Sequence, residues 1–295
     1  MKKQISFSGK GHSADIGDMK IFRILPNRYA NAVGPFVFLD HIGPTTRRNG
    51  NDEKKTGTGS HPHRGIATLS YILHGQAEHF DSRGNHEKVY SGGIQWMKAG
   101  DGIVHDENII PDPHEKNGLV HALQFWINLP AKNKAEKPEY LAIQADQIQQ
   151  KLLENESGWI KVVLGSYEEF TSPIPNYSKQ FLYHINLEAG KTFEIRIPGN
   201  IEVAVFLSSY GAIVNDTEAD AGEFIEFDRK EGVIELINNY TVTNEIMIFG
   251  GSPYSEPIVV EGPFVMNTFA EIADAYRDFY AGKYGEINYN HIENS

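Results

Sequence analysis

Two short pairs of side chains could meet at one chemical centre. His61 and His63 stand in the segment SHPHRG, and His105 and Glu107 stand in the segment GIVHDE. The members of each pair are two positions apart, and such residues point to the same face of a β-strand. Two strands of this kind side by side would present three imidazoles and one carboxylate to one point. Nitrogen donors with one carboxylate suit a divalent first-row metal, above all iron if coordination positions stay open.

The composition excludes several other chemistries. The 295 residues contain no cysteine, which rules out disulfides, thiolate zinc sites, iron–sulfur ligation and a cysteine nucleophile. The formal net charge of −12 argues against direct binding to nucleic acid, because such binding needs a basic surface. Ten of the twelve histidines lie between His12 and His121, so any histidine chemistry is expected in the first half of the chain.

Nothing in the sequence predicts a membrane protein. The opening segment MKKQISFSG lacks the apolar run of a signal peptide. No stretch approaches the roughly 20 apolar residues that a membrane-spanning helix needs. We therefore expect a cytoplasmic location.

The elements that must position the two pairs are predicted to be short β-strands. One strand is expected from His61 to Leu73, with His61 and His63 on the same face as Ala67 and Leu69. That face would look into an apolar interior, where unpaired imidazoles are costly and a metal would supply their partners. Further short strands separated by glycine turns follow over 76–98, a pattern typical of an antiparallel sandwich or barrel.

The second half of the chain repeats this β-rich texture without a second H-x-H pair. A polar segment at 130–139 predicts a domain boundary, which divides the chain into domains 1–135 and 136–295. A short helix is expected over 145–155, followed by strands from about 160 to 260.

A helix is predicted near the end of the chain. Thr268 and Glu271 have the spacing of a helix capping box, and the helix should extend to about Ala281. Phe269 and Ile272 begin an apolar stripe on this helix, which predicts that it packs on a sheet.

Several side chains and one loop have two interpretations each. Asp40 and His41 either end a strand through hydrogen bonds or belong to the wall of the site. The polar segment 45–60 is either a lid over the site or a solvated loop. Gln124 and Trp126 either pack in the core or on a sheet face, or they line a pocket.

With these segments identified, the chain resembles the pirin family of the cupin superfamily. The resemblance rests on HPHRG from His61, on GIVH ending at His105 and, most specifically, on GPFVMN at 262–267. It implies an all-β fold of two antiparallel β-barrel (cupin, jelly-roll-like) domains with a C-terminal helix, and a metal in the first domain only. The family's pattern of three histidines and one glutamate falls on His61, His63, His105 and Glu107.

The resemblance also implies an activity. Family members are described as quercetin 2,3-dioxygenases, which implies a small aromatic, flavonol-like substrate that is opened by O2. Fe(II) is the expected cofactor, although nickel, zinc, manganese and cobalt accept similar ligands. Glu107 would be the catalytic base that takes the proton of the flavonol hydroxyl.

Two other functions stay open at this point. Pirins are associated with transcriptional co-regulation, in which the oxidation state of the metal changes a surface that binds a protein partner. The acidic balance of the chain fits a protein partner better than DNA. The third possibility is a metal-stabilised storage or scaffold protein that catalyses no reaction.

Overall fold

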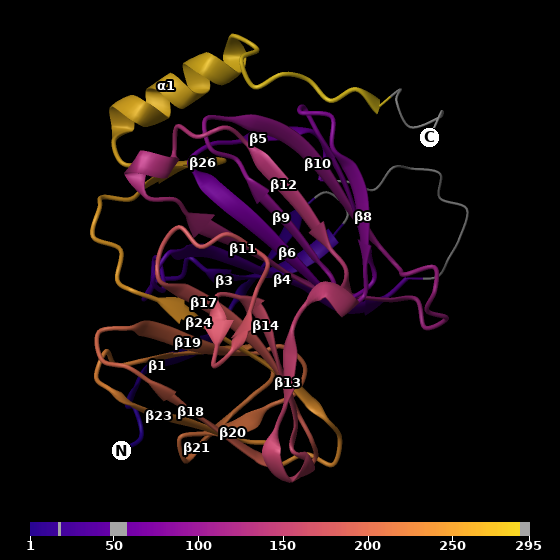
Figure 1. Cartoon of the computed structure of the whole chain (residues 1–295), viewed down its shortest axis with the longest axis vertical. Helices are drawn as coiled ribbons and strands as arrows, with labels where there is room; N and C mark the ends of the chain where they lie inside the picture. Colours follow the sequence, from indigo (N-terminus) through magenta and orange to yellow (C-terminus); the bar gives the residue numbers. More distant parts are fainter. Residues whose placement is uncertain (17–18, 48–57, 290–295) are drawn as a thin grey trace. The chain divides into compact units, whose positions relative to one another are not determined.

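The regular elements of the described residues are mostly antiparallel β-strands, with one α-helix near the end of the chain, as the computed structural model in Figure 1 shows. The structure describes residues 1–16, 19–47 and 58–289. Contacts between segments divide the chain into two units that are discontinuous in sequence. Unit 1 comprises Met1–His12, Phe22–Phe38 and Ile148–Tyr254, and unit 2 comprises Ser13–Ile21, Leu39–Gln147 and Ser255–Ser295.

Unit 2 is organised around two sheets. The larger sheet has the strand order β12-β9-β6-β11-β4-β3-β2, the smaller has the order β5-β10-β7-β8, and β25 pairs with β26. The unit boundaries fall inside β2, β3 and β4. The strands are β2 (His12–Ile16), β3 (Met19–Leu25), β4 (Phe36–Thr46), β5 (His61–His63), β6 (Ile66–His74), β7 (Gln76–Asp81), β8 (His86–Tyr90), β9 (Ile94–Lys98), β10 (Ile103–Ile110), β11 (Leu119–Asn128), β12 (Glu139–Ile143), β25 (Val259–Glu261) and β26 (Phe264–Met266).

Unit 1 repeats this plan with its own pair of sheets. The orders are β1-β22-β19-β24-β17-β14-β13 and β18-β23-β20-β21, and β15 pairs with β16. The strands are β1 (Ile5–Lys10), β13 (Gln150–Leu152), β14 (Gly158–Leu164), β15 (Ser166–Tyr167), β16 (Phe170–Thr171), β17 (Gln180–Leu187), β18 (Thr192–Ile197), β19 (Glu202–Leu207), β20 (Ala212–Val214), β21 (Thr217–Ala219), β22 (Glu223–Phe227), β23 (Gly232–Ile237) and β24 (Asn244–Gly251).

The core of unit 1 follows from the two-residue period of its strands. In β18 exposed and buried residues alternate strictly, so that one face is apolar and the other faces solvent. The apolar face joins a cluster that includes Ile160, Val205 and Ile234, all fully buried.

The all-β fold predicted from the sequence is confirmed.

The expected continuous strand from His61 to Leu73 is interrupted at Gly65. The backbone there has φ = +82°, and a Cβ atom would lie 2.0 Å from the carbonyl oxygen of Val265. Only glycine tolerates both conditions. The break separates β5 from β6, so that β5 pairs with β10 in the smaller sheet while β6 pairs with β9 and β11 in the larger one. His61 and His63 thus join the sheet that carries His105.

The compact units differ from a single cut of the chain at residue 135. The N-terminal strand β1 pairs with β22, which places the first residues in unit 1. Strand β12 follows the expected boundary but pairs with β9 and stays in unit 2. Strand pairing between segments far apart in sequence therefore decides the composition of each unit.

The helix expected over 145–155 is wrong. This segment forms the 3₁₀ turns η2 (Ala145–Gln147) and η3 (Glu154–Glu156), with strand β13 between them. Strand β13 pairs with β14, so sheet pairing overrides the local helical tendency. A third 3₁₀ turn, η1, covers Ala131–Asn133.

The predicted C-terminal helix is confirmed as α1 (Phe269–Tyr280), which lies beside β26 in Figure 1. Thr268 accepts a hydrogen bond from the Glu271 backbone, and the Glu271 carboxylate accepts one from the Thr268 backbone, which completes the capping box. Ile272 is buried against Phe264, whereas Phe269 is 74% exposed and does not belong to the packed face. No helix in the described ranges is long and apolar enough to cross a membrane.

Candidate metal centre

Three histidines converge where β5 pairs with β10. In this antiparallel pair His105 lies directly opposite His61, and Ile103 lies opposite His63. The ring centroids of His61 and His105 are 4.4 Å apart, and those of His63 and His105 are 5.0 Å apart. One ring nitrogen from each of the three lies within 4.8 Å of the others. The structure therefore brings together three of the four residues expected at the site.

Backbone carbonyls fix the orientation of two of these rings. Nδ1 of His61 lies 2.7 Å from the carbonyl oxygen of Gly59, and Nδ1 of His63 lies 3.0 Å from that of Pro263. A neutral imidazole that donates its Nδ1 hydrogen to a carbonyl keeps the lone pair on Nε2. This arrangement is typical of metal-binding histidines, whose other nitrogen donates to a carbonyl or carboxylate.

Burial keeps the imidazoles of His63 and His105 neutral near pH 7. Burial, reinforced by the neighbouring His61, lowers the pKa of His63 to about 3. The pKa of His105 is also well below the usual value, first because of burial and then because of the nearby histidines. Neither nitrogen of His105 has a hydrogen-bond partner among the residues that the structure describes. A neutral, buried and unpartnered imidazole fits a metal ligand, since a bound cation would remove the cost of the missing hydrogen bonds.

Glu107 lies beside His105, but its carboxylate is close to a different set of side chains from the three-histidine group. Its Oε2 accepts a hydrogen bond of 2.7 Å from Gln124 Nε2, and its Oε1 accepts one of 3.3 Å from Ser70 Oγ. Its Oε1 lies 4.0 Å from His105 Nδ1. Glu107 forms a second potential ligand group with His79 and His105, in which the three ligand atoms lie within 4.8 Å of one another. Its place among the ligands of the first group stays a prediction.

His79 and Asp81 are site residues that the sequence reasoning missed. Strand β7 pairs with β10 so that His79 lies opposite Glu107, and Asp81 lies opposite His105. Nε2 of His79 is 3.1 Å from Oδ2 of Asp81, and both side chains are fully buried. The signal was present as an H-x-D spacing within the predicted strand 76–81, the same spacing that singled out the other two pairs.

Trp126 and Gln124 contact residues of the centre, whereas His41 has a different partner. The ring of Trp126 meets His63 edge to face at 4.9 Å, so Trp126 forms a wall of the centre. Gln124 reaches the centre through its hydrogen bond to Glu107. His41 instead pairs with His121, with their Nε2 atoms 2.8 Å apart in a buried position.

The expected lid falls largely on residues 48–57, which lie outside the described residues. The chain that follows is anchored beside the centre. The backbone nitrogen of Thr58 donates to the carbonyl oxygen of Glu107 at 2.9 Å, and the Glu107 backbone nitrogen lies 3.3 Å from Thr58 Oγ1.

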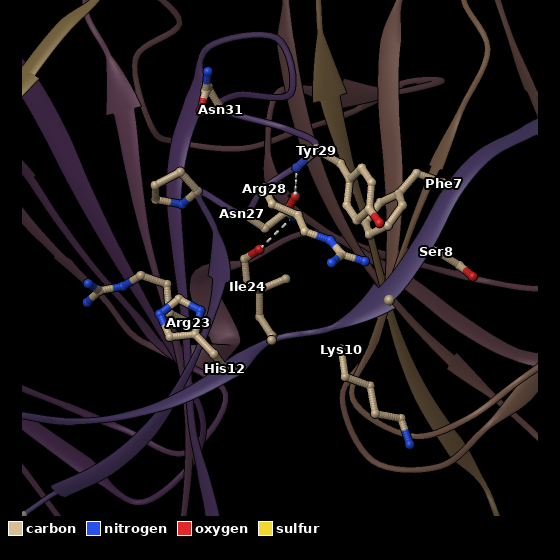
Figure 2. A pocket seen from close by; sticks show the side chains of 13 residues that line it. Phe7, Ser8, Lys10, His12, Arg23, Ile24, Asn27, Arg28, Tyr29 and Asn31 are labelled. Carbon is tan, nitrogen blue, oxygen red and sulfur yellow. Dashed lines mark hydrogen bonds between the residues drawn. The ribbon is translucent and has the colours of Figure 1, made fainter.

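A surface pocket in unit 1 has a different chemistry. It encloses about 670 Å³, and Figure 2 shows the side chains that line it, among them Lys10, Arg23 and Arg28. Its thirteen lining residues include no aspartate or glutamate, and His12 is the single imidazole among them. The guanidinium of Arg28 lies over the Tyr29 ring at 4.4 Å. Cationic side chains without carboxylates do not suit a metal ion, so the pocket is no alternative to the histidine centre.

The family models and the relatives that match this chain agree with one another. The pirin family model matches residues 18–127, and the model of the pirin C-terminal cupin domain matches residues 163–285. A Pseudomonas aeruginosa protein named "Putative quercetin 2,3-dioxygenase PA2418" is 30% identical, over 96% of this chain and 99% of its own length.

Solved structures show the same fold. The crystal structure of a quercetin 2,3-dioxygenase from Acinetobacter baumannii is 29% identical, covers 98% of this chain and 100% of its own, and superposes with a TM-score of 0.89. The bacterial pirin YhhW from Escherichia coli, solved in complex with nickel(II), is 19% identical over 84% of this chain and 99% of its own, with a TM-score of 0.63. The second likeness shows the fold alone. With both family models matched and a 30% identical relative along nearly its whole length, this chain belongs to the pirin family, with the two-cupin fold of that family.

Proposed function

We propose that this protein is a metal-dependent dioxygenase that opens flavonol-like substrates with O2. The observation that supports the proposal most strongly is the convergence of three histidines on one point, with both nitrogens of His105 lacking a partner within the described structure. The names of the Pseudomonas and Acinetobacter relatives supply the reaction class.

The metal would be held by Nε2 of His61 and of His63, together with His105. Glu107 would complete the ligand set by turning toward the three imidazoles from its position beside Gln124. We propose Fe(II) as the metal, while imidazole and carboxylate donors also accept nickel and other divalent ions. These residues belong to unit 2 and to the metal-binding domain proposed over residues 1–135.

A metal in this centre would offer open coordination positions to substrate oxygen atoms and to O2. The chain itself contributes the proton chemistry. Glu107 would take the proton of the flavonol 3-hydroxyl, because its Oε1 lies only 4.0 Å from His105 Nδ1 and its carboxylate can return to the hydrogen bonds with Gln124 and Ser70. O2 would add both of its oxygen atoms to the substrate, the ring would open and carbon monoxide would leave.

Trp126 would shape the space in which the substrate lies. Its ring packs against His63, so an aromatic surface borders the metal position on one side. A flat, apolar substrate would gain contact area there, and water would be kept away from the deprotonated flavonol.

The test is an assay of the protein loaded anaerobically with Fe(II), to which quercetin and O2 are added. The loss of flavonol absorbance and the release of carbon monoxide are followed for the unchanged protein, His63→Ala and Glu107→Gln. His184→Ala, which removes a buried histidine of unit 1, is the matched control.

We expect turnover in the unchanged protein and the control, and a loss of at least 100-fold in both site variants. Turnover of the unchanged protein no greater than that of His63→Ala would overturn the proposal. A partner protein whose affinity depends on the oxidation state of iron, without turnover, would instead support the regulatory function.

A further inference from the structure

A second donor set lies on the face shared by β7 and β10. His79 stands directly opposite Glu107 in the strand pair, and His105 is two residues away on the same face. One potential ligand atom from each of the three lies within 4.8 Å of the others, and all three residues are buried. Two imidazoles and one carboxylate form a set distinct from the three-histidine group, although His105 belongs to both.

The hydrogen bonds that orient His79 through Asp81 are those expected of a metal ligand. Its Nε2 lies 3.1 Å from Asp81 Oδ2. Asp81 is itself fixed, since its oxygens accept hydrogen bonds from the backbone of Arg83 at 2.9 Å and from the Asn85 side chain at 2.7 Å. A carboxylate so placed takes the Nε2 hydrogen of His79 and leaves the lone pair on Nδ1. A carboxylate–histidine pair of this kind is characteristic of metal sites.

The Nδ1 lone pair of His79 has no use within the part of the chain that the structure describes. This atom is buried and has no hydrogen-bond partner there. The ring cannot readily turn away, because it stacks on Tyr140 with centroids 4.0 Å apart and planes 10° apart. Its other nitrogen is held by Asp81. A buried acceptor that is fixed in orientation and unpartnered is costly unless a ligand occupies the position that it faces.

We propose that His79, His105 and Glu107 form a second cation position beside the three-histidine position. Two histidines with one carboxylate suit a divalent first-row metal that keeps open coordination positions. Because both positions need His105, and two dications so close would repel each other strongly, they are alternatives for one cation rather than a two-metal site.

The proposal also explains the orientation of Glu107. Gln124 and Ser70 hold its carboxylate where it faces His79 and His105. In this orientation Glu107 serves the second position, and turning toward His61 and His63 would make it serve the first. The side chain would therefore select between the two positions.

The second position is tested by titrating Co(II) into the metal-free protein and recording the visible absorption bands of bound Co(II). The double variant His61→Ala/His63→Ala removes the first position and keeps the second. We expect it to bind one Co(II) per chain, at least 10-fold more weakly than the unchanged protein.

Two additions to this double variant test the residues of the second position. His79→Asn should raise the dissociation constant at least 10-fold further, and Asp81→Asn should raise it by about 10- to 100-fold, the usual effect of losing the group that orients a ligand. His184→Asn, a buried histidine of unit 1, is the matched control and should change it less than 2-fold. Circular dichroism confirms that each variant is folded.

A double variant that is folded and binds no Co(II), or one whose affinity is unchanged by His79→Asn, would overturn the proposal. If His61→Ala/His63→Ala does not fold, His61→Asn/His63→Asn takes its place as the background that lacks the first position, and a Co(II) affinity that His79→Asn then leaves unchanged contradicts the proposal. The outcome is separable from the proposed dioxygenase activity, because the readout is metal binding and no flavonol is present.

Discussion

The buried pair of His41 and His121 should make the metal-free protein sensitive to mild acid. Their Nε2 atoms are 2.8 Å apart, and the residues are only 5% and 2% exposed. Burial lowers the pKa of His41 to about 4. Burial, reinforced by the neighbouring His41 and His74, lowers the pKa of His121 to about 3. One neutral ring donates its hydrogen to the other, and a proton added to this pair would remove the acceptor.

The sign follows from comparing the folded and unfolded chains. An exposed histidine has a pKa of about 6.5, so below this pH the unfolded chain binds more protons than the folded one. The free energy of unfolding therefore falls as the pH falls from about 6.5 toward the folded pKa values of about 4 and about 3. For each ring, pH 5 lies roughly 1.5 units below the pKa of about 6.5 in the unfolded chain, which corresponds to about 2 kcal/mol at about 1.4 kcal/mol per unit. At pH 5 the two rings together should therefore lower the free energy of unfolding by about 4 kcal/mol, a large share of the ~5–15 kcal/mol typical of a folded protein.

The assay is urea denaturation at pH 7.5, 6.0 and 5.0 in the presence of a chelator, followed by tryptophan fluorescence. His121→Gln removes one titrating ring and keeps a polar side chain. We expect the free energy of unfolding to fall between pH 7.5 and pH 5.0 by about 2 kcal/mol less in this variant than in the unchanged protein. His12→Gln, at an exposed position, serves as the control and should leave the pH dependence unchanged.

The reasoning would be refuted if the unchanged protein and His121→Gln lost the same free energy of unfolding over this pH range. The loss must then come from other titrating groups, such as carboxylates.

Two further substitutions test how the fold positions the site. Gly65→Ala should reduce the free energy of unfolding by more than about 2 kcal/mol, because the positive φ and the close carbonyl of Val265 leave no room for a Cβ; an unchanged urea midpoint would contradict this. Thr268→Ala should cost about 1 kcal/mol by removing the cap of α1, while Thr268→Ser should restore it; thermal unfolding measures both, and equal melting temperatures for the two variants would show that the cap does not matter.

The local features of the site could be predicted from the sequence. The alternation of side chains along a strand made His61 and His63, and then His105 and Glu107, share a face, because this periodicity depends only on the local backbone. The capping box at Thr268 was predictable for the same reason. Each of these features lies within a few consecutive residues.

The features that depend on distant partners could not be predicted in this way. The break at Gly65 depends on the carbonyl of Val265, 200 residues further along the chain. The segment 145–155 forms a strand and 3₁₀ turns because β14 offers a pairing edge. The role of His79 depends on the register of β7 with β10, which places it opposite Glu107. Spacing alone gives a pair of residues on one face, and register decides which other pair they meet.

The most direct test of the central claim is the metal content of the purified protein, measured by mass spectrometry after anaerobic handling. We predict about one transition-metal ion per chain in the unchanged protein and in His184→Ala. His105→Ala should contain almost none, because His105 belongs to both donor groups. An unchanged protein without metal, or a folded His105→Ala variant that keeps a full equivalent, would contradict the assignment of this centre.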